Sequence, residues 1–120
     1  DGARCPGRVA LRGYGEVALV PAGWHAPGRA GSVEVLQGRQ LVPHMGGRAY
    51  FADSCRPGAY DRGQYVGLKL LGKTLRYTTD VSGAGMSASG CGCNGALYLV
   101  AMRQNARATA CRDYYCDANS

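Results

Sequence analysis

The fold class is decided by the stretch Tyr65-Val66-Gly67-Leu68-Lys69-Leu70-Leu71-Gly72-Lys73-Thr74-Leu75-Arg76-Tyr77-Thr78-Thr79-Asp80-Val81. Apolar and polar residues alternate on both sides of Gly72-Lys73, and a period of two is typical of β-strands. A glycine at the first central position favours a type II′ hairpin turn. The stretch therefore predicts two antiparallel strands, Tyr65–Leu71 and Thr74–Val81, joined at Gly72-Lys73.

Three shorter segments upstream also have strand-like patterns. Glu16–Val20 alternates, and Val33–Leu36 with Leu41-Val42 predicts a hairpin that turns at a glycine. Arg48–Ala52 predicts a further strand. The rest of residues 1–37 is rich in glycine and proline, which favours turns and loops.

Downstream, Ala96–Met102 is the longest purely apolar run. A strand that is apolar on both faces is typical of the middle of a β-sandwich, so we expect this run to be central. It is far shorter than the ~20 residues of a membrane span. With 19 glycines among 120 residues, long helices are disfavoured. We therefore predict one all-β domain over residues 1–120, with long Gly/Pro-rich loops between short antiparallel strands.

The charge balance limits the class of partner. The chain is 46% hydrophobic and carries a formal net charge of +6. It has no basic run and no aromatic–basic motif of an RNA-binding sheet, so we expect no nucleic-acid partner. The basic excess has two interpretations: a solvated surface, or attraction to a polyanion or an acidic protein face.

The cysteine content indicates an oxidising environment. Six cysteines in a small, loop-rich chain favour disulfides, and hence the extracellular space or an organelle lumen. Because the chain starts at Asp1, we expect a processed N-terminus. The cysteines could instead bind zinc, but their spacing departs from the usual C-x2-C pattern of zinc sites. We therefore expect no cofactor. The cysteines are Cys5, Cys55, Cys91, Cys93, Cys111 and Cys116.

Two stretches carry a resemblance to a known family. The first comprises Leu70-Leu71-Gly72-Lys73, Asp80-Val81-Ser82 and Cys91-Gly92-Cys93-Asn94-Gly95-Ala96-Leu97-Tyr98-Leu99-Val100-Ala101-Met102; the second is Tyr115-Cys116-Asp117-Ala118. In this order they resemble glycoside hydrolase family 7, the cellulases and cellobiohydrolases. The resemblance covers residues 38–120 and leaves 1–37 as a loop-rich N-terminal part. It implies a partial or reduced jelly-roll, concanavalin-like β-sandwich.

The resemblance also bears on catalysis. The family hydrolyses β-1,4-glucan with retention, through a Glu-x-Asp-x-x-Glu strand that follows the Tyr-Cys-Asp segment. This sequence ends at Ser120, before that strand, and its two glutamates are Glu16 and Glu34. A retaining glycosidase needs two carboxyl groups about 5–5.5 Å apart, and no Asp/Glu pair has the i, i+2 spacing of one strand face. We therefore expect these 120 residues to be non-catalytic, either as such or as part of a longer enzyme.

Sugar-binding residues are implied by the same resemblance. Carboxamides and carboxylates bond sugar hydroxyls, and a tyrosine offers a stacking face with a polar tip. Other interpretations remain for three residues: Tyr98 as core, Asn94 as turn chemistry before Gly95, and Trp24 as a packing anchor instead of a sugar platform. The residues that match the family's glucan cleft are Asn94, Tyr98, Tyr115 and Asp117, with Asn119 where the family usually has Gln.

One disulfide expectation depends on the departures from the family. Cys93 stands where the family commonly has Leu, and the family partners of Cys91 and Cys116 would lie beyond this sequence. If Arg103–Ala106 is a hairpin turn, position 93 faces position 116, so a Cys93–Cys116 bridge is geometrically reasonable.

Two functional hypotheses follow. The chain is either a family 7-related protein that binds β-1,4-glucan, or a structural accessory subunit docked on a larger protein assembly. The second hypothesis expects the contact face to include the strand beside Ala96–Met102 and arginines such as Arg103, Arg107 and Arg112.

Overall fold

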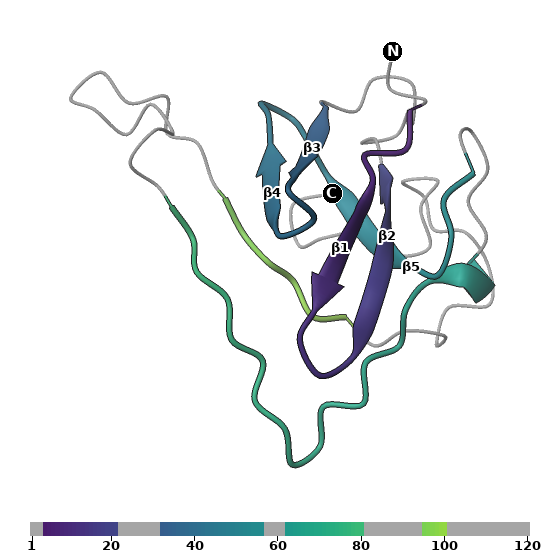
Figure 1. Cartoon of the computed structure of the whole chain (residues 1–120), viewed down its shortest axis with the longest axis vertical. Coiled ribbons are helices and arrows are strands. Elements are labelled where there is room, and N and C mark those ends of the chain that lie inside the picture. Colours follow the sequence, from purple (N-terminus) through teal and green to yellow (C-terminus); the bar gives the residue numbers. More distant parts are fainter. Residues whose placement is uncertain (1–3, 22–31, 57–61, 81–94, 101–120) are drawn as a thin grey trace. The chain divides into compact units, whose positions relative to one another are not determined.

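The computed structural model describes residues 4–21, 32–56, 62–80 and 95–100 (Figure 1). The chain divides into two compact units. The sheet unit comprises Asp1–Gly67 with Val100–Ser120, and the middle unit comprises Leu68–Leu99. Within the described ranges all regular strands belong to the sheet unit, and the helical content is one 3-10 turn, η2 (Arg62–Gln64). The expected all-β class is thus confirmed for this part of the chain.

A three-stranded antiparallel sheet organises the sheet unit. It consists of β1 (Arg8–Leu11), β2 (Gly15–Pro21) and β5 (Ala49–Ala52) in the order β1-β2-β5. The strands predicted within Glu16–Val20 and Arg48–Ala52 are confirmed as β2 and β5. β1 was not expected, because the glycines and prolines around it indicate turns. Arg8–Leu11 becomes a strand because it pairs with β2.

The second sheet is the predicted hairpin of β3 (Val33–Leu36) and β4 (Gln40–Pro43). At its turn both Gln37 (φ 53°) and Gly38 (φ 64°) adopt the left-handed conformation, which the primed hairpin turns require. The Arg39 N–H donates to the Leu36 carbonyl at 3.1 Å. The turn also reaches the other sheet, since the Ala10 N–H donates to the Gly38 carbonyl at 2.9 Å.

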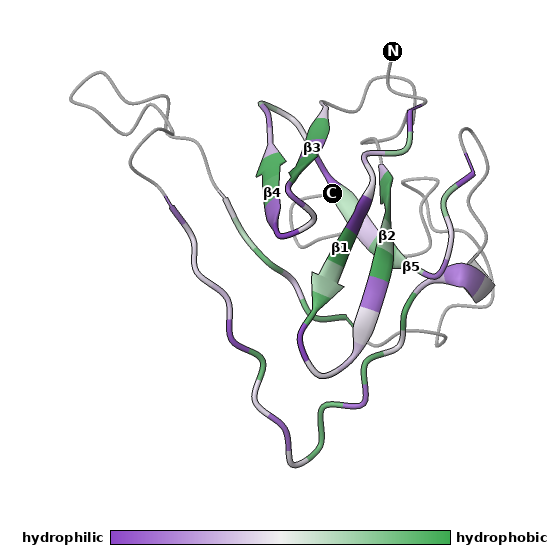
Figure 2. Ribbon diagram, viewed as in Figure 1, coloured by the Kyte–Doolittle hydropathy of each residue, from purple (hydrophilic) through white to green (hydrophobic). Residues whose placement is uncertain are grey.

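β2 is the buried centre of this unit because it is paired along both edges and covered on both faces. Val17 and Leu19 on one face are each 1% exposed, and Val20 on the other face is 3% exposed. Val20 packs in one hydrophobic cluster with Ala52 and Tyr65. In Figure 2 the inner part of β2 is accordingly hydrophobic.

A disulfide closes the sheet unit. Cys5, before β1, is bonded to Cys55, after β5, with the two Cα atoms 5.9 Å apart. Cys55 also packs against the cluster of Val20, Ala52 and Tyr65. The bridge therefore joins both outer strands of the sheet and lies against its core. The sequence left the pairing of these two cysteines open, and their bridge is consistent with an oxidising compartment.

The hairpin predicted at Tyr65–Leu71 and Thr74–Val81 is wrong as far as it is described. Tyr65 forms an isolated bridge with Ala52, and the residues after it, up to Asp80, are assigned to no strand. The turn itself exists, with the Lys73 N–H donating to the Leu70 carbonyl at 3.0 Å, but Gly72 (φ 69°) is its third residue instead of its second. Alternation in a sequence indicates which face a strand would bury, yet a lone two-stranded ribbon is marginal without a core to cover.

The central strand predicted at Ala96–Met102 is also wrong over its described part. Residues 96–100 are assigned to no strand, and Leu97 and Leu99 are 41% and 63% exposed. β2 holds the central position instead, because it has a pairing partner at each edge. An apolar run is buried only where neighbours are available to cover it. Ala101 and Met102 lie outside the described residues.

Candidate binding surfaces

Large apolar and aromatic side chains are exposed along the middle unit. Leu71 is 99% exposed, Tyr77 61% and Tyr98 51%. Single exposed hydrophobic residues are ordinary. Several of them within the two short stretches 68–80 and 95–99 are typical of a binding surface. Figure 2 shows hydrophobic and hydrophilic residues alternating along the first of these stretches. The other members in this unit are Leu75, Leu97 and Leu99.

Basic side chains are interleaved with these apolar ones. Lys69, Lys73 and Arg76 are all exposed in the same stretch, which also holds the acidic Asp80. Hydrogen-bond donors therefore alternate with apolar side chains along it. Such a surface suits a ligand that offers both apolar faces and oxygen acceptors.

Among the sugar-binding residues implied by the family resemblance, Tyr98 is the one that the structure describes. It is 51% exposed, so the alternative that places it in the core does not hold. The predicted Cys93–Cys116 bridge and the remaining pairings involve positions outside the described ranges. Also outside them are Trp24, Asn94, Tyr115, Asp117, Asn119, Cys91, Cys93, Cys111 and Cys116.

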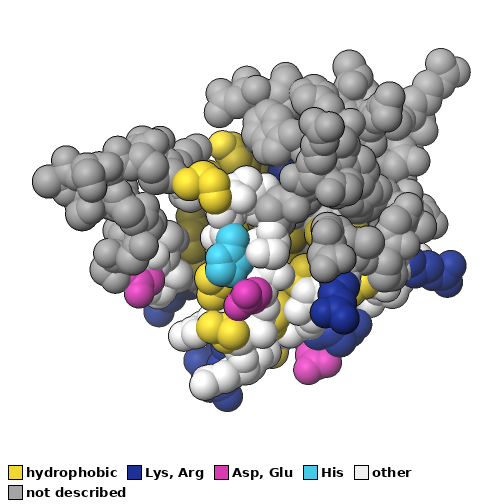
Figure 3. All heavy atoms as spheres, turned by 90° about the horizontal axis from the view of Figure 1, so that it is seen from above, with side chains coloured by type: hydrophobic (Ala, Val, Ile, Leu, Met, Phe, Trp, Pro, Cys, Tyr) yellow, Lys and Arg dark blue, Asp and Glu magenta, His cyan; other side chains and the backbone are white. Residues whose placement is uncertain are grey.

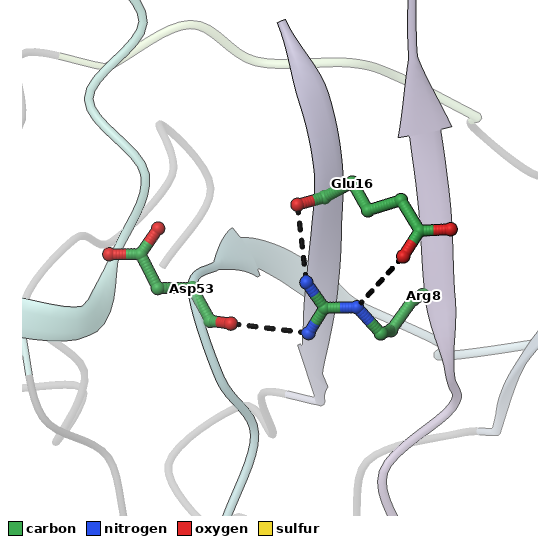
Figure 4. A network of polar contacts seen from close by, with 3 residues as sticks. All are labelled: Arg8, Glu16 and Asp53. Carbon is green, nitrogen blue, oxygen red and sulfur yellow. Dashed lines mark hydrogen bonds and ion pairs between the residues drawn. The ribbon is translucent and has the colours of Figure 1, made fainter.

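In the sheet unit, Arg8 is the centre of a polar network (Figure 4). Its guanidinium donates to the backbone carbonyls of Asp53 and Glu16, each at 3.2 Å. Arg8 Nε also lies 3.5 Å from Glu16 Oε2. The two side chains of this ion pair are 49% and 69% exposed, so water screens the pair and its chief effect is to tie β1 to β2 and to the end of β5.

The second glutamate lies beside a histidine at the molecular surface, where Figure 3 shows an acidic side chain next to a histidine ring. His44 Nε2 is 3.1 Å from Glu34 Oε1, and both side chains are about half exposed. No pattern singled out in the sequence predicts this pair. The hairpin register could have found it, because Glu34 faces Val42 in the ladder and His44 is two residues farther along the same strand direction.

These contacts leave the glutamates with local roles. Glu16 lies beside Arg8 and Glu34 beside His44, so each carboxylate has a basic neighbour. Within the described ranges, no three His, Cys, Asp or Glu residues are grouped closely enough to hold a metal ion. In the same ranges no helix has the length and apolar character to cross a membrane.

Comparisons of the chain with protein-family models, curated proteins and solved structures found no match.

Proposed function

We propose that this chain is a non-catalytic β-protein related to the family 7 β-sandwich and that it binds β-1,4-glucan. The observation that carries the proposal is the half-exposed ring of Tyr98. This residue ends the Asn94-Gly95-Ala96-Leu97-Tyr98 segment, the most distinctive part of the resemblance. A tyrosine with an apolar role alone would gain more from burial, so its exposure favours a contact with a ligand.

The chemistry of the middle unit supports a sugar ligand. Glucose units of a β-1,4-glucan present C–H faces that pack on aromatic rings, and hydroxyl groups that bond to polar side chains. Tyr77, 61% exposed, offers a second ring, and Lys73 and Arg76 offer N–H donors in the same stretch. The Cys5–Cys55 bridge supports a secreted or lumenal protein, where such a ligand would be met.

Titration with cellohexaose, together with a cellulose pull-down, tests the proposal. Tyr98→Ala should weaken binding about two- to twelvefold, because a ring-stacking contact is worth roughly 0.5–1.5 kcal/mol. Tyr98→Phe should retain most of the affinity. Tyr14→Ala is the matched control, since Tyr14 is also 51% exposed but lies in the β1–β2 turn of the sheet unit. Equal affinity of the wild-type chain and Tyr98→Ala, or no binding by the wild type, would contradict the proposal.

The exposed leucines favour a second candidate, an accessory subunit docked on a protein assembly. Leu71 and Leu99, 99% and 63% exposed, are side chains that a sugar would not cover. Burying each one is worth about 1.5–3 kcal/mol. The basic residues beside them suit a partner with an acidic surface. Light scattering separates the candidates: a monomer that binds cellohexaose supports the glucan proposal, whereas self-association that Leu71→Ser and Leu99→Ser abolish supports docking.

A further inference from the structure

An open pocket of about 690 Å³ is lined by residues of the sheet unit. It is formed where the β1–β2 hairpin meets the turn between β3 and β4. The hydrogen bond from the Ala10 N–H to the Gly38 carbonyl holds these two elements together at this place. The size falls within the range of about 300–1,000 Å³ that is usual for small-molecule sites. The lining residues are Ala10, Leu11, Arg12, Gly15, Glu16 and Arg39.

Two cations of this pocket have no acidic partner among the residues that the structure describes. In the part of the chain that the structure describes, neither Arg12 nor Arg39 takes part in an ion pair or a side-chain hydrogen bond. The acidic residue of the pocket, Glu16, is instead held by Arg8 through its Oε2 atom at 3.5 Å. The pocket lining thus contains two arginines and one carboxylate that already has a partner, which leaves the pocket with a positive excess.

The other lining atoms narrow the ligand class. Ala10, Leu11 and Gly15 provide a small, apolar wall against which a ring can lie. Arg8 contacts Glu16 through Oε2, so the Oε1 atom is available to accept a hydrogen bond from a hydroxyl group. A guanidinium fork matches the geometry of a carboxylate or sulfate oxygen pair. The pocket thus combines two anion-binding forks, one hydroxyl acceptor and an apolar wall.

From this combination we propose that the Arg12–Arg39 pocket binds an acidic sugar, a hydroxylated ring that bears a carboxylate or a sulfate ester. Arg12 and Arg39 hold the anionic group, and Glu16 accepts from a ring hydroxyl. Neither tyrosine of the glucan proposal takes part, and the pocket lies in the other compact unit. The two proposals can therefore fail separately.

Calorimetric titration of the full chain tests this site with four probes: digalacturonate, sulfated cellobiose, cellobiose and inorganic sulfate. The two acidic sugars represent the two sources of the anionic group. At least one acidic sugar should bind about tenfold or more tightly than cellobiose and than inorganic sulfate. An acidic sugar can contact both the arginine guanidinium groups and the apolar wall of the pocket, whereas cellobiose lacks the anionic group and sulfate lacks the ring. The affinity should fall as the salt concentration rises.

The variants complete the test. Arg12→Ala and Arg39→Ala should each weaken binding of the acidic sugar about tenfold, and Arg39→Lys should lie between wild type and Arg39→Ala, because lysine keeps the charge but lacks the fork. Arg56→Ala is the matched control: this exposed arginine lies in the same unit but does not line the pocket, so its loss should leave the affinity unchanged. The proposal would be overturned if neither acidic sugar bound, if the arginine variants weakened cellobiose or sulfate binding as much as acidic-sugar binding, or if the arginine variants kept wild-type affinity for the acidic sugars. Circular dichroism confirms that each variant is folded.

Discussion

Replacing Cys5 by alanine should remove about 4 kcal/mol from the free energy of unfolding of the sheet unit at 25 °C. The disulfide partners are 50 residues apart in sequence, and opening a loop of this length returns a large conformational entropy to the unfolded chain. The loss is large beside the total stability of about 5–15 kcal/mol that a small domain has. The variant should therefore be close to its unfolding threshold at ordinary temperatures.

Urea unfolding followed by far-ultraviolet circular dichroism measures this loss. The experiment is best made near pH 5, where few thiols are ionised and thiol–disulfide exchange is slow. Cys55→Ala provides the comparison. It opens the same loop but also removes the sulfur that packs against Val20, Ala52 and Tyr65, so it should cost up to about 1 kcal/mol more than Cys5→Ala. A loss below about 1 kcal/mol for Cys5→Ala would refute the loop-closure reasoning.

Two further predictions concern packing in the sheet unit and on the middle unit. Gly47→Ala should lower the free energy of unfolding by about 1–3 kcal/mol, because a Cβ there would lie 2.6 and 2.7 Å from two backbone carbonyl oxygens. Gly67→Ala is the control: Gly67 has open space around it, so the unfolding midpoint should change little. Equal midpoints for these two variants would show that the hairpin end can relax. Leu19→Ala should lower the free energy of unfolding by about 2–5 kcal/mol, because Leu19 is 1% exposed. Leu71→Ala, at a 99% exposed position, should change the free energy of unfolding by no more than about 0.5 kcal/mol in the same urea titration. A loss for Leu71→Ala that matched the loss for Leu19→Ala would mean that Leu71 is buried in solution.

Strand prediction succeeded where a short segment carried its own turn chemistry. The β3–β4 hairpin was predictable because Gly38 marks its turn and apolar residues flank it. β1 was missed because Arg8–Leu11 lies among turn-forming residues and becomes a strand by pairing with β2. The opposite error occurred at Tyr65–Leu71 and Thr74–Val81, where a regular alternation led to a predicted strand pair. The described residues from Val66 to Asp80 are assigned to no strand.

For the candidate sites, too, some features follow from the local sequence and others depend on the fold. Tyr98 was singled out from the sequence, but its exposure, which decides between a core and a ligand contact, depends on the neighbours that the fold supplies. Arg12 and Arg39 carry no local signal, since arginines are spread singly along the chain. They line one pocket because the turn between β3 and β4 is hydrogen-bonded to β1.

Turn residues, short apolar periods and cysteine content act locally or through composition. For this reason the amino-acid sequence was enough to predict the all-β class of the described residues, the β3–β4 hairpin and the involvement of Cys5 and Cys55 in disulfide bonding. Tertiary structure alone decided that β2 is the central strand, that Cys5 pairs with Cys55 and that Arg8 binds at the end of β5. Each of these depends on contacts between residues far apart in the chain. Such contacts form when the free energy gained by burial exceeds the entropic cost of closing the loop between the two residues. No local sequence pattern records this balance.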